Sequence, residues 1–365
     1  MASLTKPPGD CSTTEYHFED EQADAIIQTT AYHRRDYCLS VIWFPPSQHD
    51  IIRSSIATPF QRPSTSTAGL GDLDCLPLEL LCETLQHLDM RSLFKFRQVN
   101  SSSRQVVDSL PQYQRIVTYG LRLFCALLRT RTASEISLNA FHTALYTKTC
   151  KLCNDFAGFI FLPSWTRICP PCILCAGETR MRPLDTVNER LRLTSLKESR
   201  LKPFYALPGI YTMGQIPQET RRTLVLLCRV FPLCDSSRRR ALHSAPSSGS
   251  GSTLRNGSYL ERKCSYMASC ALPYLDRQTG VVERGVLCAG CHVALEDKSL
   301  GARGVIQRIR ARDMVYSREG FLKHFRVCGY AQRLWEASDE GARRPPGLPV
   351  FAQMGGEFRR RNDFV

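Results

Sequence analysis

Cysteines constrain this chain more than any other feature, because they occur in closely spaced pairs. The sequence holds 17 cysteines among 365 residues. Cys150 and Cys153 form one C-x2-C pair, Cys169 and Cys172 form a second, and fifteen residues separate the two pairs. Two thiolates on a tight turn can face one ion, and two such turns complete a tetrahedron. This spacing indicates a structural zinc site that leaves no open position for bound water.

Two alternatives remain open for this first group. The cysteines could be free thiols that fill a core, and Cys175, which forms a further pair with Cys172, could replace a ligand. The spacer between the pairs is rich in Phe, Ile and Trp, which favours a short hairpin that brings the pairs together.

A second group is predicted near the C-terminus, from Cys288, Cys291, His324 and Cys328. Ser317 is the expected cap of a helix on which His324 and Cys328 lie one turn apart, on the same face. The long interval between Cys291 and His324 makes this pattern less specific. Alternatives remain here also: His324 could be an ordinary polar helix residue, and other cysteines could replace a ligand or stay unassigned, namely Cys264, Cys270, Cys228 and Cys234.

The compartment expected from the sequence is the cytoplasm, the nucleus or both. The first residues contain no apolar core of signal-peptide length, so we expect a reducing compartment, where clustered cysteines favour metal binding over disulfides. Cys288-Ala-Gly-Cys291-His292 also matches the attachment pattern of c-type haem, but such attachment implies export. No apolar run approaches the length that spans a bilayer.

Composition divides the chain into segments. We predict a disordered tail over residues 1–70, a compact helical unit over 71–120, and a helical region with the first zinc knuckle over 121–240. A Ser/Gly-rich flexible insert over 241–258, a second zinc-binding module over 259–338 and a disordered tail over 339–365 follow. Residues 37–44 could form a strand. The expected fold class is mainly α, with small β elements at the zinc knuckles and a zinc-stabilised α+β module.

The segment that begins at residue 71 predicts three short helices. Leucines recur at helical spacing from Leu78, after Pro77 in the expected first turn, and Asp89 and Asn100 are suited to cap the next two helices. About 45 residues cannot bury three amphipathic faces completely, so some apolar surface should remain for a partner.

In residue order and spacing this segment resembles the F-box. The matching residues include Leu76-Pro77-Leu78-Glu79-Leu80-Leu81, then Leu85, Leu88, Asp89, Ser92, Leu93, Phe96, Arg97, Val99 and Asn100. Residues 109–113 and the cysteine-rich C-terminal stretch resemble fungal members of the family. The resemblance implies docking on the Skp-type adaptor of a cullin–RING ubiquitin ligase, with contacts expected from Leu76, Pro77, Leu80, Leu81, Leu85, Leu93 and Val99.

Three functions fit these observations. The first is a non-catalytic substrate receptor that presents an unknown protein target, with ubiquitin transfer supplied in trans, because the first cysteine group provides too few ligands for a RING domain. The second is a zinc-stabilised nucleic-acid-binding protein, which a net charge of +14 and the arginines Arg308, Arg310 and Arg312 would favour. The third is a structural protein whose F-box no longer docks. No phosphate-binding loop or serine nucleophile elbow is present.

Overall fold

Helices provide most of the regular structure, and the strands between them are short, which confirms the predicted fold class. The computed structural model describes residues 15–44, 50–58, 69–191, 201–212, 216–233, 263–296 and 302–354. The helices are α1 (Ala23–Thr30), α2 (Arg35–Ser40), α3 (Asp50–Ala57), α4 (Leu78–His87), α5 (Met90–Arg97), α6 (Ser101–Ser109), α7 (Pro111–Thr130), α8 (Leu138–Leu145), α9 (Pro170–Cys175), α10 (Leu184–Leu191), α12 (Leu227–Val230), α15 (Ala289–Glu296), α16 (Ala302–Arg312), α17 (Arg318–Phe325), α18 (Gly329–Ala337) and α19 (Val350–Gln353).

The strands form several small antiparallel sheets. Their orders are β3-β2-β9, β4-β8-β5, β1-β12, β10-β11 and β6-β7. The strands are β1 (Ala31–Tyr32), β2 (Phe159–Phe161), β3 (Thr166–Ile168), β4 (Met181–Pro183), β5 (Phe204–Ala206), β6 (Gly209–Tyr211), β7 (Ile216–Gln218), β8 (Arg222–Leu226), β9 (Ser269–Ala271), β10 (Tyr274–Leu275), β11 (Val282–Glu283) and β12 (Leu287–Cys288).

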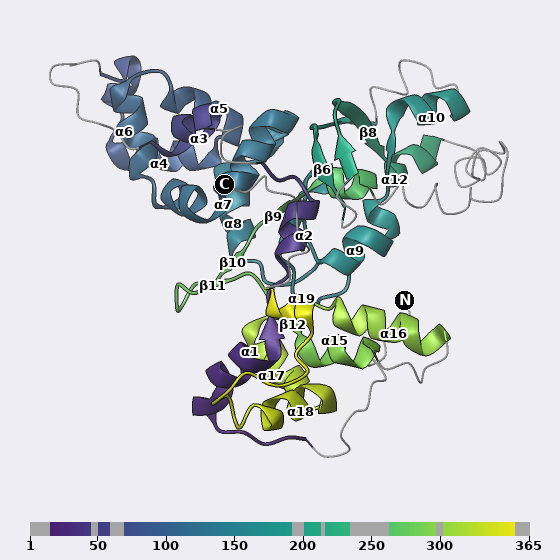
Figure 1. Cartoon of the computed structure of the whole chain (residues 1–365). Helices are drawn as coiled ribbons and strands as arrows, with labels where there is room; N and C mark the ends of the chain where they lie inside the picture. The colour runs from purple at the N-terminus through teal and green to yellow at the C-terminus, as the bar shows by residue number, and fades with distance from the viewer. Residues whose placement is uncertain are drawn as a thin grey trace.

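Three groups of elements are visible in Figure 1. Helices α3 to α7 gather at the upper left, the strands around β8 with α10 and α12 at the upper right, and α1 with α15 to α18 at the bottom. The described helices include none that is long and apolar enough to cross a membrane.

The three predicted helices of residues 71–120 are present as α4, α5 and α6. The Asp89 side chain accepts hydrogen bonds from the Arg91 and Ser92 amides and so caps α5, and Asn100 caps α6 by accepting from the Ser103 amide. These caps satisfy amides that a helix start leaves without a partner. Pro77 is the N-cap of α4 rather than a residue of its first turn.

Helix α7 continues from this cluster into the rest of the molecule. Its twenty residues begin at Pro111, whose missing N–H costs nothing at the first position. Its buried residues follow one face from Tyr113 to Leu123, and from Leu123 to Leu127 every residue is buried, so the helix is enclosed there on all sides. At about 1.5 Å per residue the helix spans roughly 30 Å, so it links the N-terminal helices to the middle of the chain.

The predicted disorder of residues 1–70 is wrong for the part that the structure describes. Helix α1 packs on α17 and α18, β1 pairs with β12, and α3 packs on α7. The expected strand over residues 37–44 is instead the end of α2 and a single bridge from Ile42 to Cys270. Ile26, Ile42 and Ile56 are fully buried, Ile26 in the cluster around Phe321 and Phe325 and the other two in the main core. Single buried residues of this kind produce no periodic pattern, so their burial cannot be predicted from the sequence.

The structure confirms some of the other predictions and contradicts others. The hairpin between the cysteine pairs is confirmed as β2–β3, with Ile160 opposite Arg167, whereas the β4-β8-β5 sheet was not predicted. Disorder over 339–365 is wrong for residues 339–354, which include α19 with buried Ala352. The insert predicted at 241–258 lies outside the described residues.

Candidate metal centres and partner surface

The first cysteine group is assembled as the spacing predicts. The sulfur atoms of Cys150, Cys153, Cys169 and Cys172 all lie within 4.8 Å of one another, and Cys153 Sγ is 3.5 Å from Cys169 Sγ. Cys175 is exposed and lies outside the group, which resolves the alternative ligand in favour of Cys172.

Two tight turns aim these sulfurs at one point. In the first turn the Cys150 amide donates to Asp155 O at 2.7 Å, and Asn154 adopts a left-handed conformation with φ 63°. In the second, Cys169 is the N-cap of α9, so Cys172 lies in its first turn. The β2–β3 hairpin joins the two turns. Each of the two turns thus positions two of the four sulfur atoms.

Protonation in this group favours a thiolate at Cys150. Hydrogen bonds from the Cys169 and Cys172 thiols lower the pKa of Cys150 far below its usual value, against the opposing effect of burial. A thiolate is the form in which cysteine binds metal. Burial raises the pKa of Cys153, and hydrogen bonding within the group together with burial raises the pKa values of Cys169 and Cys172. Without an ion the arrangement therefore favours one thiolate, at Cys150.

The second group is also assembled, but through different local structure. The ligand atoms of Cys288, Cys291, His324 and Cys328 lie within 4.8 Å of one another. Ser317 caps α17 by accepting from the Gly320 amide, as predicted. The prediction that His324 and Cys328 share one helical face is wrong, because α17 ends at Phe325 and Cys328 is the N-cap of α18.

The spacings in this second group suit a tetrahedral ion. Cys328 Sγ lies 3.8 Å from Cys288 Sγ and 4.0 Å from Cys291 Sγ, and Cys291 Sγ lies 3.3 Å from His324 Nε2. Metal–sulfur bonds of about 2.3 Å place the sulfurs of a tetrahedral site about 3.8 Å apart. The Cys291 amide also donates to Cys288 Sγ, at 3.3 Å. Both groups could therefore hold a metal ion.

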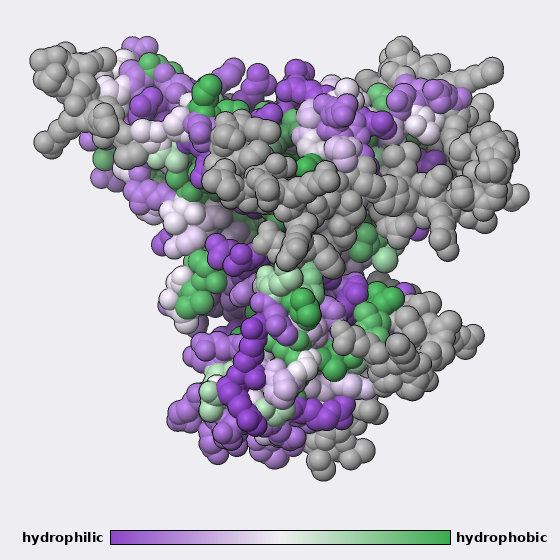
Figure 2. Space-filling model, viewed as in Figure 1, coloured by the Kyte–Doolittle hydropathy of each residue, from purple (hydrophilic) through white to green (hydrophobic). Residues whose placement is uncertain are grey.

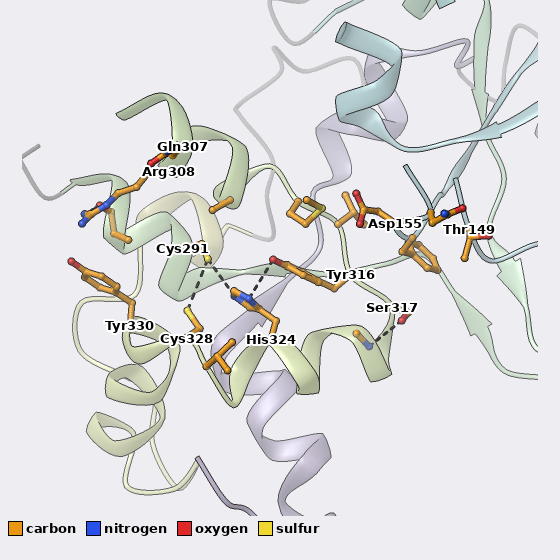
Figure 3. Close-up of a pocket in the computed structure, with 18 of the residues that line it drawn as sticks. Thr149, Asp155, Cys291, Gln307, Arg308, Tyr316, Ser317, His324, Cys328 and Tyr330 are labelled. Carbon is orange, nitrogen blue, oxygen red and sulfur yellow. Dashed lines mark hydrogen bonds between the residues drawn. The ribbon is translucent and has the colours of Figure 1, made fainter. Parts of the chain in front are cut away.

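Tyr316 positions the histidine of the second group, a role that the sequence did not reveal. Its ring stacks on the His324 imidazole with centroids 4.6 Å apart, and its hydroxyl is 3.4 Å from His324 Nδ1. This contact leaves Nε2 directed at Cys291 (Figure 3). Partners of this kind orient a ligating imidazole and determine which nitrogen carries the proton.

Within the described residues, the other cysteines that the sequence offered as ligands do not join either group. Cys264 and Cys270 are buried and Cys228 is exposed, all three outside both sets of ligand atoms, while Cys234 lies outside the described residues. His292, the histidine of the haem-like motif, is also outside the second group and contacts the Tyr32 hydroxyl through Nδ1 at 3.2 Å.

Gly290, between Cys288 and Cys291, is required by the approach of α18. A Cβ at this position would lie 2.3 Å from the Ala331 nitrogen and 2.7 Å from its Cα, so backbone would have to move. We predict that Gly290→Ala lowers the free energy of unfolding by about 1–3 kcal/mol or more, through overpacking. Denaturant unfolding of the full chain measures this. Gly177→Ala is the control, because nothing lies within 4 Å of the added Cβ, and an equal loss in both variants would contradict the assignment.

A cavity of about 450 Å³ lies beside the second group. Cys291, His324 and Cys328 border it on one side, and Thr149 and Asp155, from the turn of the first group, border it on the other (Figure 3). Its wall thus includes backbone held in place by both cysteine groups. The volume is within the range of small-molecule and side-chain pockets.

The start of α4 carries an uncovered apolar surface. We call Leu73, Leu76, Leu78, Leu80 and Val99 the α4 apolar surface; their exposed fractions are 37%, 39%, 56%, 52% and 68%. Val99 is included because it precedes Asn100, whose side-chain amide donates to Gly69 O. This hydrogen bond holds the loop after α5 beside the residues that lead into α4. Figure 2 shows that hydrophobic residues elsewhere on the visible face occur in small groups.

The predicted contact residues divide into two kinds. Leu76, Pro77, Leu80 and Val99 are exposed, as a docking role requires. Leu81, Leu85 and Leu93 are buried in the main core, so their contact with a partner stays a prediction. They occupy the inner face of the same helices and hold the outer face in place.

An N-terminal helix braces this cluster without covering the α4 apolar surface. Buried Arg97 pairs with Asp108 at 2.7 Å and donates to backbone oxygens at the end of α3, including Thr58 O at 2.8 Å. The Tyr113 hydroxyl donates to Ile56 O at 2.9 Å. The exposed leucines of α4 remain exposed with α3 in place.

Comparison with known proteins identifies one segment. Residues 73–115 match the family model described as F-box domain, which places the match on α4 to α6 and the start of α7. No curated protein matches the chain, and no solved structure does.

Proposed function

The chain is an F-box protein, and from this premise we propose that it is the substrate-receptor subunit of a cullin–RING ubiquitin ligase. F-box proteins are in general non-catalytic adaptors of such ligases. The observation that carries the proposal is the α4 apolar surface, which lies inside the family match and stays open to solvent. Apolar surface of this kind on a small helical unit marks a protein-binding site.

In the proposed complex the α4 apolar surface docks on a Skp-type adaptor. Leu76, Pro77, Leu80 and Val99 supply the contacts, and the buried leucines keep the three helices in register. Hydrophobic burial then drives association. The chain's own contribution to ubiquitin transfer is positional, because holding a target near the conjugating enzyme raises its effective concentration.

We further propose that both cysteine groups hold zinc. Four thiolates, or three thiolates and an imidazole, in tetrahedral reach are the donor sets of structural zinc. All ligand positions come from the protein, so these ions would stiffen the fold and perform no chemistry. The modules they hold are the candidate target-binding part, and the expected location is the cytoplasm, the nucleus or both.

The proposal is tested by mixing the full-length, zinc-loaded chain with a purified Skp-type adaptor. Size-exclusion chromatography should show one complex that contains both proteins, and metal analysis of the same fraction should find about two zinc ions per chain. Separate elution of two well-folded proteins would overturn the adaptor assignment.

A further inference from the structure

A basic cleft is lined by none of the cysteine-group ligands and by none of the residues of the α4 apolar surface. This cavity of about 640 Å³ is formed by α2, α7 and the segment from β11 to β12. Among the residues that the structure describes, the side chains that line it include one histidine, four arginines and no carboxylate, the basic residues being His33, Arg34, Arg35, Arg122 and Arg284. A concave site of one charge sign focuses its potential on whatever enters.

Arg34 is held in place by ion pairs and forms part of the wall of the cleft. Arg34 pairs with Asp36 at 2.8 Å and with Asp313 at 2.7 Å, and its guanidinium lies 4.1 Å from the centre of the Tyr37 ring. The neighbouring carboxylate of Glu283 is engaged elsewhere, because it accepts from the Arg318 amide at 3.2 Å. Asp36, Asp313 and Glu283 are thus each engaged with a partner other than Arg122 and Arg284.

Arg122 and Arg284 carry the uncompensated charge. Within the part of the chain that the structure describes, neither side chain makes a hydrogen bond or an ion pair. They come from α7 and from the residue after β11, and both act on the Cys38 thiol: burial raises its pKa, the two positive charges oppose that rise, and the Asp36 carboxylate adds to it. Two unpaired guanidiniums thus converge on one place from distant parts of the sequence.

The rest of the cleft is apolar. The apolar side chains that line it include Leu39, Trp43, Phe159 and Val315. A matching ligand therefore carries negative charge next to an apolar group. A nucleic-acid strand would instead need cations in a track along its backbone with aromatic faces between them, whereas these guanidiniums converge on a single cavity.

We propose that the basic cleft binds an acidic segment of a partner protein, whose carboxylates pair with Arg122 and Arg284 while an adjacent apolar side chain enters the cavity. Guanidinium forks match carboxylates in geometry as well as charge. That this partner is the target for ubiquitin transfer rests on the proposed function; the binding itself does not. The N-terminal segment, through α2, supplies part of the site.

The test is fluorescence anisotropy with the full-length, zinc-loaded chain and a labelled peptide that has glutamates on both sides of one leucine. A matched peptide has glutamine at each glutamate. The cleft variant is Arg122→Glu/Arg284→Glu. The control is Arg310→Glu/Arg343→Glu, which makes the same change in net charge at two exposed arginines outside the cleft.

We expect the glutamate peptide to bind and the glutamine peptide to bind at least about tenfold more weakly. The cleft variant should lose about a hundredfold in affinity, the control variant should stay within about threefold, and Arg122→Lys/Arg284→Lys should retain most of the binding. Equal binding of both peptides, or equal loss in both reversed variants, would overturn the inference. So would a single-stranded RNA oligonucleotide that competes for the cleft more strongly than the peptide.

The same samples separate this inference from the proposed function. Each variant is also mixed with the Skp-type adaptor, which contacts a different surface. Adaptor binding without peptide binding removes only the cleft assignment. Peptide binding without adaptor binding removes the ligase assignment and leaves the cleft in place. A melting temperature equal to that of the unmodified chain shows that the variants are folded.

Discussion

Replacing Cys169 with serine should unfold the middle of the chain and remove one metal ion. Cys169 is almost fully buried, is the N-cap of α9 and lies in the first cysteine group. A structural zinc site contributes roughly 10–16 kcal/mol to folding in small domains, which is comparable to the whole stability of about 5–15 kcal/mol of a typical protein. Zinc content should fall from about two ions per chain to about one, with a large drop in melting temperature.

Cys175→Ser is the matched control for this experiment. Cys175 ends the same helix, is exposed, and lies outside the ligand group. It should keep both ions and the melting temperature of the unmodified chain. If Cys169→Ser behaved like Cys175→Ser in both measurements, the metal assignment would be discarded.

Replacing Leu80 with aspartate should abolish capture of the Skp-type adaptor while the chain remains folded. Leu80 is 52% exposed on α4, so the substitution introduces charge without opening a cavity. In the proposed complex the same side chain would be buried against the adaptor. A buried, unpaired carboxylate at such a position costs roughly 3 kcal/mol or more, about a hundredfold or more in Kd.

Val281→Asp provides the control for Leu80→Asp. Val281 is 54% exposed, nearly the same as Leu80, but it lies beside β11 and outside the family match. Adaptor capture should be unchanged in this variant. Equal capture by both variants would show that the α4 apolar surface does not contact the adaptor.

Local patterns explain what the sequence could predict. The caps Asp89, Asn100 and Ser317 act on amides two or three residues away, so spacing alone identifies them. The cysteine pairs are equally local, since each pair needs only one turn. The β2–β3 hairpin follows because both pairs must meet.

The remainder depends on contacts between distant segments. The described parts of residues 1–70 are held in place by single residues such as Ile26 and Ile56, which are buried against distant parts of the chain. No periodic pattern in the sequence predicts these contacts. Which leucines of the F-box face inward was also not predicted, and Leu85 and Leu93 proved to be core. Arg122 and Arg284 lie far apart in sequence, so their cleft is visible only once the chain is folded.

Isothermal titration calorimetry of the full-length, zinc-loaded chain with a purified Skp-type adaptor tests the central claim most directly. The claim is that the α4 apolar surface exists to be covered by another protein. The account predicts one adaptor bound per chain with a negative heat-capacity change, the mark of apolar burial, and loss of that signal in Leu80→Asp. The absence of binding by a chain that is folded and carries its metal would contradict it.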